Sequence, residues 1–214
     1  MQHPFIREEY KANPSFTDAQ LTVNDYLLIV QPHEDLYNKI MQLKKSFAEK
    51  YDNPMAMYLK PHLTLLRFMQ YDMQQQKIIQ QLQHITETKA PFKIDLNGFG
   101  SFPTHTIYVN VETKNKLIEL GKSLKAAQHL MKLDKDHKPH FITEPHISIA
   151  RKLLPWQYEK AWLEYSNTPF AASFMVNDLV LLKRRAETKG YSIAAKFPLL
   201  SKAQQTTTQG QLFF

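Results

Sequence analysis

Two seven-residue stretches of the sequence decide the fold: Pro61-His62-Leu63-Thr64-Leu65-Leu66-Arg67 and Pro145-His146-Ile147-Ser148-Ile149-Ala150-Arg151. Proline, histidine and arginine coincide in the two stretches. A serine of the second stands where the first has a threonine, and two leucines of the first are isoleucines in the second. One His-x-Ser/Thr sequence alone would say little. Two copies in matching frames predict an internal duplication, in which each half of the chain supplies one strand.

The period of a strand places the polar side chains of each stretch together. Residues i and i+2 share a face of a strand, so His62 lies beside Thr64 and His146 beside Ser148. The alternate leucines and isoleucines then point into a core. If a pseudo-two-fold axis relates the two halves, the two pairs of histidine and hydroxyl face each other across a cleft.

Such a set of side chains suits the hydrolysis of a phosphodiester. A neutral imidazole takes a proton from water or a hydroxyl, and a protonated imidazole gives one to the leaving oxygen. An unperturbed pKa near ~6.5 lets both forms exist near neutral pH. The hydroxyls of Thr64 and Ser148 would hydrogen-bond the non-bridging phosphate oxygens as charge develops. This chemistry requires neither a metal ion nor another cofactor, so we expect none.

Hydrophobic periodicity around the two stretches predicts alternating strands and helices. The segment 26–30 is typical of a buried strand, and the spacing of apolar residues in 34–50 predicts an amphipathic helix. Strands are expected at 26–30, 58–68, 92–99, 106–111, 145–150, 174–182 and 191–197, and helices at 34–50, 73–88, 115–130 and 156–165. Two hairpins, the first with a turn over 98–103 and the second with a basic turn, indicate antiparallel pairing. We therefore expect an α+β fold.

The chain is expected to form a single domain over residues 1–214, with room for two lobes. No linker rich in proline, glycine or serine divides it. Residues 1–23 are polar and irregular and are interpreted as an N-terminal extension. The low-complexity segment 200–214 is interpreted as a mobile tail.

The composition excludes several classes of protein. A hydrophobic content of 43% is enough for a core and excludes general disorder, and the absence of cysteine excludes disulfides and thiolate chemistry. Only five glycines occur, none of them in a nucleotide-cradling loop. The net charge of +7 suits a polyanionic partner such as RNA or a phosphorylated metabolite. Neither a signal peptide nor an apolar run of ~20 residues is present, so we expect a soluble, cytoplasmic protein without a membrane partner.

The other histidines are poor candidates for a site. His84 also stands in a His-x-Thr sequence, but it lies in an expected helix, where i and i+2 do not share a face. His137 and His140 lie close to the second stretch, yet their spacing matches no zinc pattern. His105 begins an expected strand. We therefore predict no metal site.

At this point the sequence resembles the 2H phosphoesterase superfamily, which includes 2′-5′ RNA ligases and RNA 2′,3′-cyclic phosphodiesterases. The two seven-residue stretches resemble its paired motifs, the segment 98–103 its middle segment, and residues 174–191 its closing hairpin. The resemblance spans residues 24–199. It implies a bilobal fold, in which two pseudo-symmetric antiparallel sheets flanked by helices enclose a central cleft. It also implies that His62 and His146 are the catalytic pair and that Thr64 and Ser148 bind phosphate.

Four further residues are candidate substrate contacts: Arg67, Arg151, Tyr191 and Tyr58. By strict alternation the two arginines lie on the face opposite the histidines or just past the strand ends, where packing or solvation would be the alternative. Tyr191 follows a glycine in the closing hairpin, and Tyr58 precedes the first stretch. The basic turn that begins with 183–185 replaces a serine or an acidic residue frequent in the family. It is either a solvated hairpin tip or a contact to a phosphate backbone.

The leading hypothesis is a metal-independent phosphoesterase that hydrolyses a 2′,3′-cyclic phosphate or a 2′-5′ phosphodiester of RNA or a nucleotide. Three alternatives use the same residues: an RNA- or nucleotide-binding module with little turnover, an RNA 2′-5′ ligase, and a 3′-end exonuclease. The expected partner is the RNA or nucleotide substrate. We expect no protein partner and a monomer.

Overall fold

The computed structural model describes residues 21–58, 60–185, 188 and 190–203. Most of the N-terminal extension and most of the tail, residues 1–20 and 204–214, lie outside the described residues, so both interpretations remain predictions. The described helices include none that is long and apolar enough to cross a membrane.

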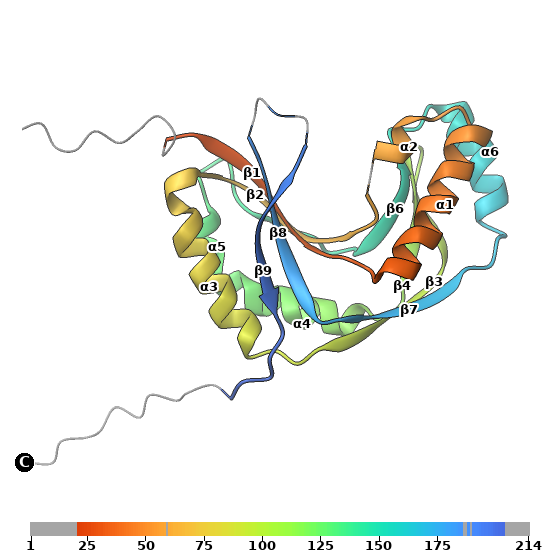
Figure 1. The fold of residues 1–214 in the computed structure, drawn as a ribbon. Helices are drawn as coiled ribbons and strands as arrows, with labels where there is room; N and C mark the ends of the chain where they lie inside the picture. Colours follow the sequence, from red (N-terminus) through yellow and green to blue (C-terminus); the bar gives the residue numbers. More distant parts are fainter. Residues whose placement is uncertain (1–20, 59, 186–187, 189, 204–214) are drawn as a thin grey trace, which may run out of the picture.

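The described residues form one antiparallel sheet of nine strands (Figure 1). Its strands are β1 (Val23–Val30), β2 (Leu63–Tyr71), β3 (Phe92–Phe102), β4 (Thr106–Val111), β5 (His140–Phe141), β6 (His146–Arg151), β7 (Ala171–Val176), β8 (Asp178–Arg185) and β9 (Ser192–Pro198). The order is β7-β3-β4-β6-β2-β1-β8-β9, and the short β5 pairs with β2. The α+β class and both hairpins, β3–β4 and β8–β9, are confirmed.

The expectation of two separate sheets is wrong, because the two motif strands pair with each other. Leu63 of β2 pairs with Ile147 of β6, and this contact joins both halves into one sheet. Both side chains are fully buried. The sheet is strongly curved, and its two halves rise on either side of β2 and β6 (Figure 1). A single sheet that bends at its centre therefore replaces the two predicted lobes.

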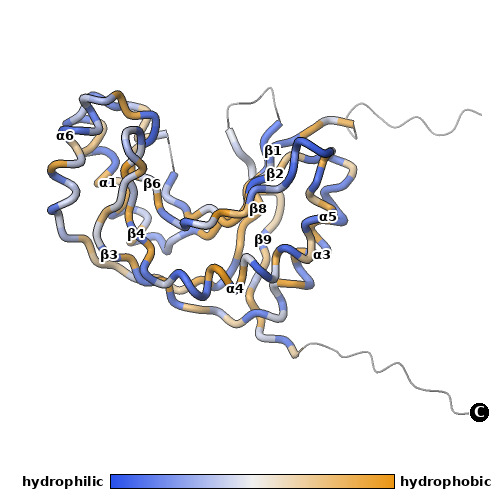
Figure 2. Tube along the Cα trace, turned by 180° about the vertical axis from the view of Figure 1, so that it is seen from behind, coloured by the Kyte–Doolittle hydropathy of each residue, from blue (hydrophilic) through white to orange (hydrophobic). Residues whose placement is uncertain are grey.

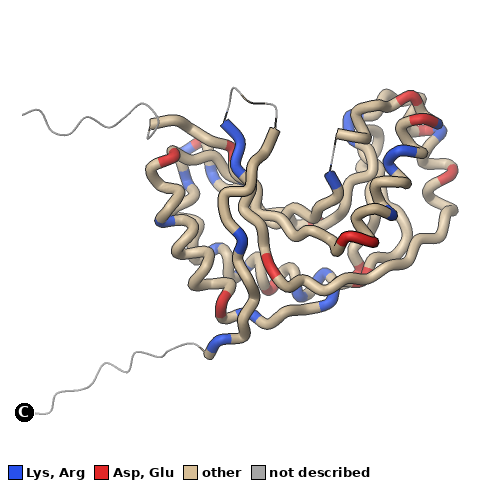
Figure 3. Tube along the Cα trace, in the orientation of Figure 1, with Lys and Arg blue, Asp and Glu red and all other residues tan. Residues whose placement is uncertain are grey.

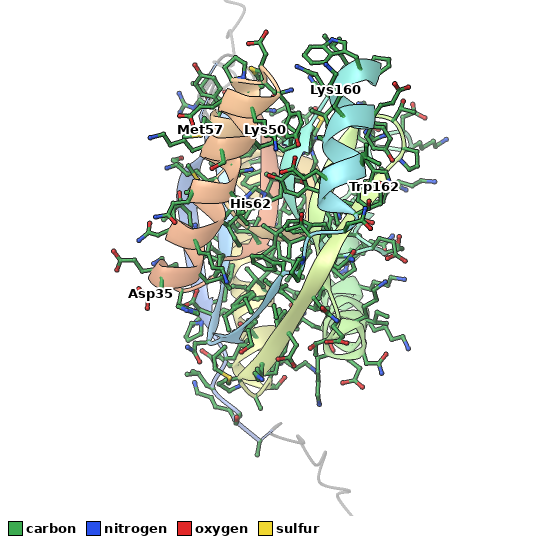
Figure 4. All side chains as sticks on the ribbon, turned by 90° about the vertical axis from the view of Figure 1, so that its right-hand side faces the viewer. Asp35, Lys50, Met57, His62, Lys160 and Trp162 are labelled. Carbon is green, nitrogen blue, oxygen red and sulfur yellow. The ribbon has the colours of Figure 1, made fainter. Side chains whose placement is uncertain are left out.

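Among the described residues, the longer helices cover the outer, convex face of this sheet. α3 (Gln75–Glu87), α4 (Lys114–Leu124) and α5 (Gln128–Met131) lie on the half that contains β1, β2, β8 and β9. On the other half, α1 (Glu34–Lys50) and α6 (Pro155–Tyr165) lie side by side, joined by the Lys50–Glu164 ion pair (Figures 1 and 4). The short α2 (Met55–Tyr58) packs against β6. Figure 2 shows that hydrophobic residues concentrate in the strands between these helices and on the helix sides that face them.

Two expected elements are divided in the structure. The expected helix 115–130 is α4, the 3-10 turn η2 (Lys125–Ala127) and α5 in succession. The expected strand 174–182 is two strands that meet at Asn177. β7 pairs with β3 and β8 with β1, so the chain crosses between the two halves of the sheet at this residue. The sequence carries a sign of the crossing that the analysis missed, because the polar pair Asn177-Asp178 interrupts the apolar run.

The expected turn over 98–103 is misplaced as well, because residues 98–102 continue β3. Gly98 has φ +63, the left-handed backbone conformation that glycine adopts most readily, and the register of β3 on β4 shifts at this point. The glycine therefore marks a bulge within the strand. The actual turn to β4 follows Phe102.

Each motif strand also contains a bulge, and the two bulges occupy equivalent positions. In β2, Leu66 pairs with Leu28 and Thr64 with Ile29, which leaves Leu65 as the extra residue. In β6, the register likewise shifts around Ile149. One extra residue reverses the alternation that follows. The arginine five residues after each histidine therefore returns to the histidine's face, and the prediction from strict alternation is wrong.

A test of the continuous sheet follows from the pair at its centre. Leu63→Ala and Ile147→Ala each delete a fully buried side chain and are expected to cost roughly 2–5 kcal/mol of unfolding free energy. Because the two residues are in contact, the double variant is expected to lose less than the sum. Urea unfolding of the wild type is expected to give one transition in both circular dichroism and tryptophan fluorescence. Both tryptophans lie in α6, so fluorescence reports on one half alone. Separate midpoints would show that the halves unfold independently.

Candidate active site

The two motif histidines are held in equivalent ways. Nδ1 of His62 lies 2.7 Å from the carbonyl oxygen of Lys60, and Nδ1 of His146 lies 2.7 Å from that of Glu144. In each case the partner is the residue two positions earlier. A carbonyl oxygen only accepts, so Nδ1 carries the hydrogen in both rings, and Nε2 is the free nitrogen. Both rings therefore present the same nitrogen for proton transfer.

The central strand pair brings the two motifs together on the concave face of the sheet. Around the pair Leu63–Ile147, antiparallel register directs His62 toward Ser148 and Thr64 toward His146. All four polar side chains are half-buried. The charge of His146 acts on the pKa of His62, which agrees with a close approach of the two rings. The structure thus brings the four predicted residues to one place (His62 is labelled in Figure 4).

Burial and nearby cations lower the pKa of both histidines. For His62 and for His146 the largest cause is burial, which disfavours the charged ring. The guanidinium of Arg151 lowers both pKa values further, and Lys44 adds to the effect on His62. Both rings are therefore mainly neutral at pH 7.

Two aromatic side chains pack around His146. The ring of Phe102 lies 5.0 Å from the histidine ring at an interplanar angle of 80°, and the ring of Tyr108 lies 4.7 Å away at 43°. Gly100 makes room for this arrangement, because a Cβ atom there would lie 2.4 Å from Oδ1 of Asn110 and 2.5 Å from the ring of Tyr108. The sequence analysis missed both aromatics, although Tyr108 falls on a face that alternation in 106–111 could have indicated.

Lys44 of α1 supports the second motif strand from behind. Its side chain is fully buried, and its Nζ donates to the carbonyl oxygens of Ser148 at 2.7 Å and of Ile149 at 2.8 Å. These are carbonyls of the β6 bulge. Burial, together with Arg151, lowers the pKa of Lys44 to about 7. The sequence carries a signal for this residue, since Lys44 is four residues after Ile40, on the core face of the helix.

A second polar cluster lies on the concave face beside the motifs. Asp25 accepts hydrogen bonds from Nε of Arg67 at 3.1 Å and Nη2 of Arg67 at 2.9 Å, from Nη2 of Arg184 at 2.6 Å, and from Oη of Tyr191 at 2.7 Å. Burial alone would raise the pKa of Asp25, but these hydrogen bonds hold it below its usual value. Arg184 also stacks on the ring of Tyr191. We call these four residues the Asp25 cluster; the sequence analysis missed Asp25 and did not separate Arg184 from its neighbours.

The predicted substrate contacts are thus divided between different surroundings. Arg67 and Tyr191 belong to the Asp25 cluster, and Arg151 lies within electrostatic range of both histidines and of Arg67. Tyr58 stands apart on α2, where its side chain is 78% exposed. The residues of the basic turn are also divided between two faces of the sheet. Lys183 pairs with Asp72 on the outer face, whereas Arg184 belongs to the Asp25 cluster.

Among the other described histidines, His140 of β5 lies across from Arg67 in the sheet, and His105 stacks on Phe102. His84 is exposed on α3, and His137 pairs with Asp134 in a loop. Within the described ranges, no three His, Asp or Glu side chains are placed to hold a metal ion together.

Comparison with known proteins places the chain in a family. The profile of the 2'-5' RNA ligase superfamily matches residues 32–188, so the chain belongs to this superfamily. A Geobacillus kaustophilus protein, GK0864, to which phosphoesterase activity has been ascribed, is 31% identical over 123 residues; the match covers 56% of this chain and 67% of that protein.

Solved structures share the fold. E. coli LigT complexed with 3'-AMP is 15% identical, with a TM-score of 0.61 over 83% of this chain and 98% of that chain. TT0787 of Thermus thermophilus is 20% identical, with a TM-score of 0.56 over 84% of this chain and 100% of that chain.

The lowered pKa of Lys44 gives a test by stability. The pKa is about 7 in the folded chain and ~10.4 in the unfolded one. Between these values the unfolded chain binds more protons, so the free energy of unfolding rises with pH, by at most about 1.4 kcal/mol per pH unit. Relative to Lys44→Met, the wild type is therefore expected to gain stability from pH 7 to pH 9 in urea unfolding. Parallel curves for the two proteins would show an unshifted lysine.

Proposed function

We propose that the protein is a metal-independent phosphoesterase that hydrolyses a 2′,3′-cyclic phosphate or a 2′-5′ phosphodiester of RNA or a nucleotide. The observation that carries the proposal is the matched presentation of two histidines. Each ring is fixed through Nδ1 by a carbonyl two residues earlier, and each has a hydroxyl of the opposite motif as its neighbour. Membership in the superfamily and the phosphoesterase activity ascribed to a relative support the same chemistry.

His62 and His146 would act as the acid–base pair. The neutral Nε2 of one ring takes a proton from water as the water oxygen forms a bond to phosphorus. The bond from phosphorus to the leaving 2′ or 3′ oxygen breaks, and the other ring, protonated, gives its proton to that oxygen. The pseudo-two-fold arrangement suits in-line attack, because acid and base stand on opposite sides of the phosphorus.

A bound phosphate group would itself favour protonation of the histidine that acts as the acid. Both rings are mainly neutral before substrate arrives, because burial and Arg151 lower their pKa values. A bound phosphate anion favours the charged form of a nearby imidazole and raises its pKa. The hydroxyls of Thr64 and Ser148, with the charge of Arg151, would stabilise the phosphoryl oxygens as negative charge develops.

The substrate class has support from the structural neighbours as well. E. coli LigT has been crystallised with 3'-AMP, NADP+ and ATP, which are all nucleotides. We propose a nucleotide or an RNA end for this chain, consistent with its charge of +7. Ligation would be the reverse use of the same residues, and a binding module would keep them without turnover.

Replacing either histidine is expected to abolish most of the activity. With 2′,3′-cyclic nucleotides as substrates and excess EDTA present, His62→Ala and His146→Ala are each expected to reduce kcat about 10²–10⁴-fold, because each removes a proton-transfer group. His84→Ala is the matched control, since it alters the exposed His-x-Thr sequence of α3. Full activity in both motif variants, or loss of activity on adding EDTA, would contradict the proposal.

The dependence of activity on pH is expected to follow the two lowered pKa values. kcat/KM reports the free protein, and it is highest where one ring is neutral and the other is protonated. We therefore expect its maximum below pH ~6.5. Arg151→Gln removes a cation that lowers both pKa values, so the profile is expected to move to higher pH. Arg151→Lys keeps the charge and is expected to leave the profile in place. An identical profile for all three proteins would exclude this role of Arg151.

A further inference from the structure

The Asp25 cluster carries more positive charge than its carboxylate can neutralise. Asp25 is almost fully buried, and two guanidinium groups, those of Arg67 and Arg184, hydrogen-bond to it. The described part of the chain shows no other carboxylate in contact with these two arginines. The charge of Arg67 acts in turn on the pKa of Arg151, so a third guanidinium group lies within electrostatic range of the cluster.

The carboxylate of Asp25 orients the two arginines but does not occupy all of their hydrogen-bond donors. Arg67 gives Asp25 its Nε and Nη2, and a guanidinium has five N–H donors. The side chain of Arg67 is 56% exposed and that of Arg184 is 33% exposed. Nε of Arg184 is buried without a hydrogen-bond partner, so the donors available to a ligand are the other free N–H groups of these partly exposed guanidinium groups. A guanidinium fixed in this way is prepared for the planar, two-point binding of a phosphate.

The position of the cluster relates it to the histidine pair. Thr64 and Arg67 lie on one face of β2 and are separated by two residues, one of which is the bulge residue Leu65, a distance of at most about 10 Å along the strand. The charge of Arg151 acts on the pKa of both histidines, and the charge of Arg67 acts on the pKa of Arg151, so the two groups lie within electrostatic range of each other. A substrate phosphate at the histidines would thus leave the Asp25 cluster within the reach of the next phosphate of an RNA chain.

The register of β8 places Arg184 on the same face of the sheet as Asp25 and Arg67. β1 pairs with β8 so that Asp25 faces Arg184, and successive residues of a strand alternate between faces. Arg184 therefore lies on the concave face, whereas Lys183 and Arg185 lie on the opposite face. Basic residues mark β8 where it reaches its loop (Figure 3). The strand thus places one of three consecutive cations toward the candidate site.

We propose that Arg67 and Arg184, held by Asp25, bind a second phosphate of the substrate, next to the one that is hydrolysed. This inference rests on the proposed function and specifies its substrate: an RNA end or nucleotide with a further phosphate on its 5′ side is preferred over a mononucleotide with only the cyclic phosphate. Asp25 is a positioning residue in this arrangement, because it acts through the two arginines.

The experiment compares three substrates. They are adenosine 2′,3′-cyclic phosphate, the same compound with a 5′-phosphate, and the dinucleotide ApA with a terminal 2′,3′-cyclic phosphate. A charged hydrogen bond to phosphate is worth ~1.5–3 kcal/mol, so the wild type is expected to prefer the substrates with a second phosphate by roughly 10–100-fold in kcat/KM. A gain with the 5′-phosphate alone would identify a terminal phosphate as sufficient, and a gain only with the dinucleotide would identify the internal phosphodiester.

Variants separate the proposed site from general charge. Arg67→Gln and Arg184→Gln are each expected to reduce the preference at least 5-fold, measured within each variant as the ratio of kcat/KM for the dinucleotide to kcat/KM for the mononucleotide. Arg185→Gln removes the same charge from the opposite face and is expected to leave the preference unchanged. Arg67→Lys keeps the charge but loses the two-point geometry, and it is expected to retain part of the preference. A wild type without preference, or a preference that survives both glutamine variants, would overturn the inference.

A binding measurement keeps the two proposals distinguishable. The dissociation constants of 3′-AMP and of ApA with a 3′-phosphate are compared by titration calorimetry. If neither a cyclic phosphate nor a 2′-5′ phosphodiester is hydrolysed, the proposed function fails; tighter binding of the dinucleotide that is lost in Arg67→Gln would still support the second phosphate site. Hydrolysis of all three substrates at equal rates would leave the function standing and remove the second site. Equal binding of the two ligands would also count against the site.

Discussion

The antiparallel pair between Leu63 and Ile147 is the contact on which the rest of the structure depends. An antiparallel pair has a local two-fold axis, so a duplicated motif that pairs with itself at equivalent positions acquires pseudo-symmetry without further design. The same contact joins the two halves of the sheet and sets the histidine of each motif near the hydroxyl of the other. The symmetry of the candidate site and the continuity of the sheet are therefore consequences of one register. A one-residue slip would send every polar side chain of a motif to the opposite face.

The bulges at Leu65 and Ile149 bring the arginine of each motif to the concave face, which regular strands could not do. A regular strand would place the arginine of each motif among the buried leucines, where an unpaired charge is costly. With one extra residue, Arg67 and Arg151 reach the concave face. A bulge leaves carbonyl groups without ladder partners, and in β6 the buried Lys44 supplies the donors. The helix behind the sheet thus takes part in the electrostatics of the candidate site, although it lies on the other face.

Much of the fold could be predicted, because it follows from local periodicity. The spacing of apolar residues located α1 to its observed ends, and the duplicated motif predicted two equivalent strands with histidine and hydroxyl on one face. The predictions that were wrong concern features that depend on pairing between distant segments. Whether β2 and β6 pair, which strands β7 and β8 join, and where a bulge interrupts the alternation are all decided by partners that a single sequence does not reveal. Asp25 was missed for the same reason, since its partners come from two other strands and from Tyr191, just before β9.

In the proposed reaction, the charges on the concave face would impose an order on the steps. Without an anion, the guanidinium of Arg151 and the burial of the rings keep both histidines neutral, which provides a base but no acid. A phosphate that binds among these cations reverses the local balance, since its negative charge favours an imidazolium nearby. The acid would then form where and when the leaving group is in place. The cations would therefore have two opposed effects: they would attract the phosphate, and they would disfavour protonation of the histidines until it is bound. Asp25 neutralises one guanidinium and fixes both arginines, and a net positive charge that could attract a phosphate remains.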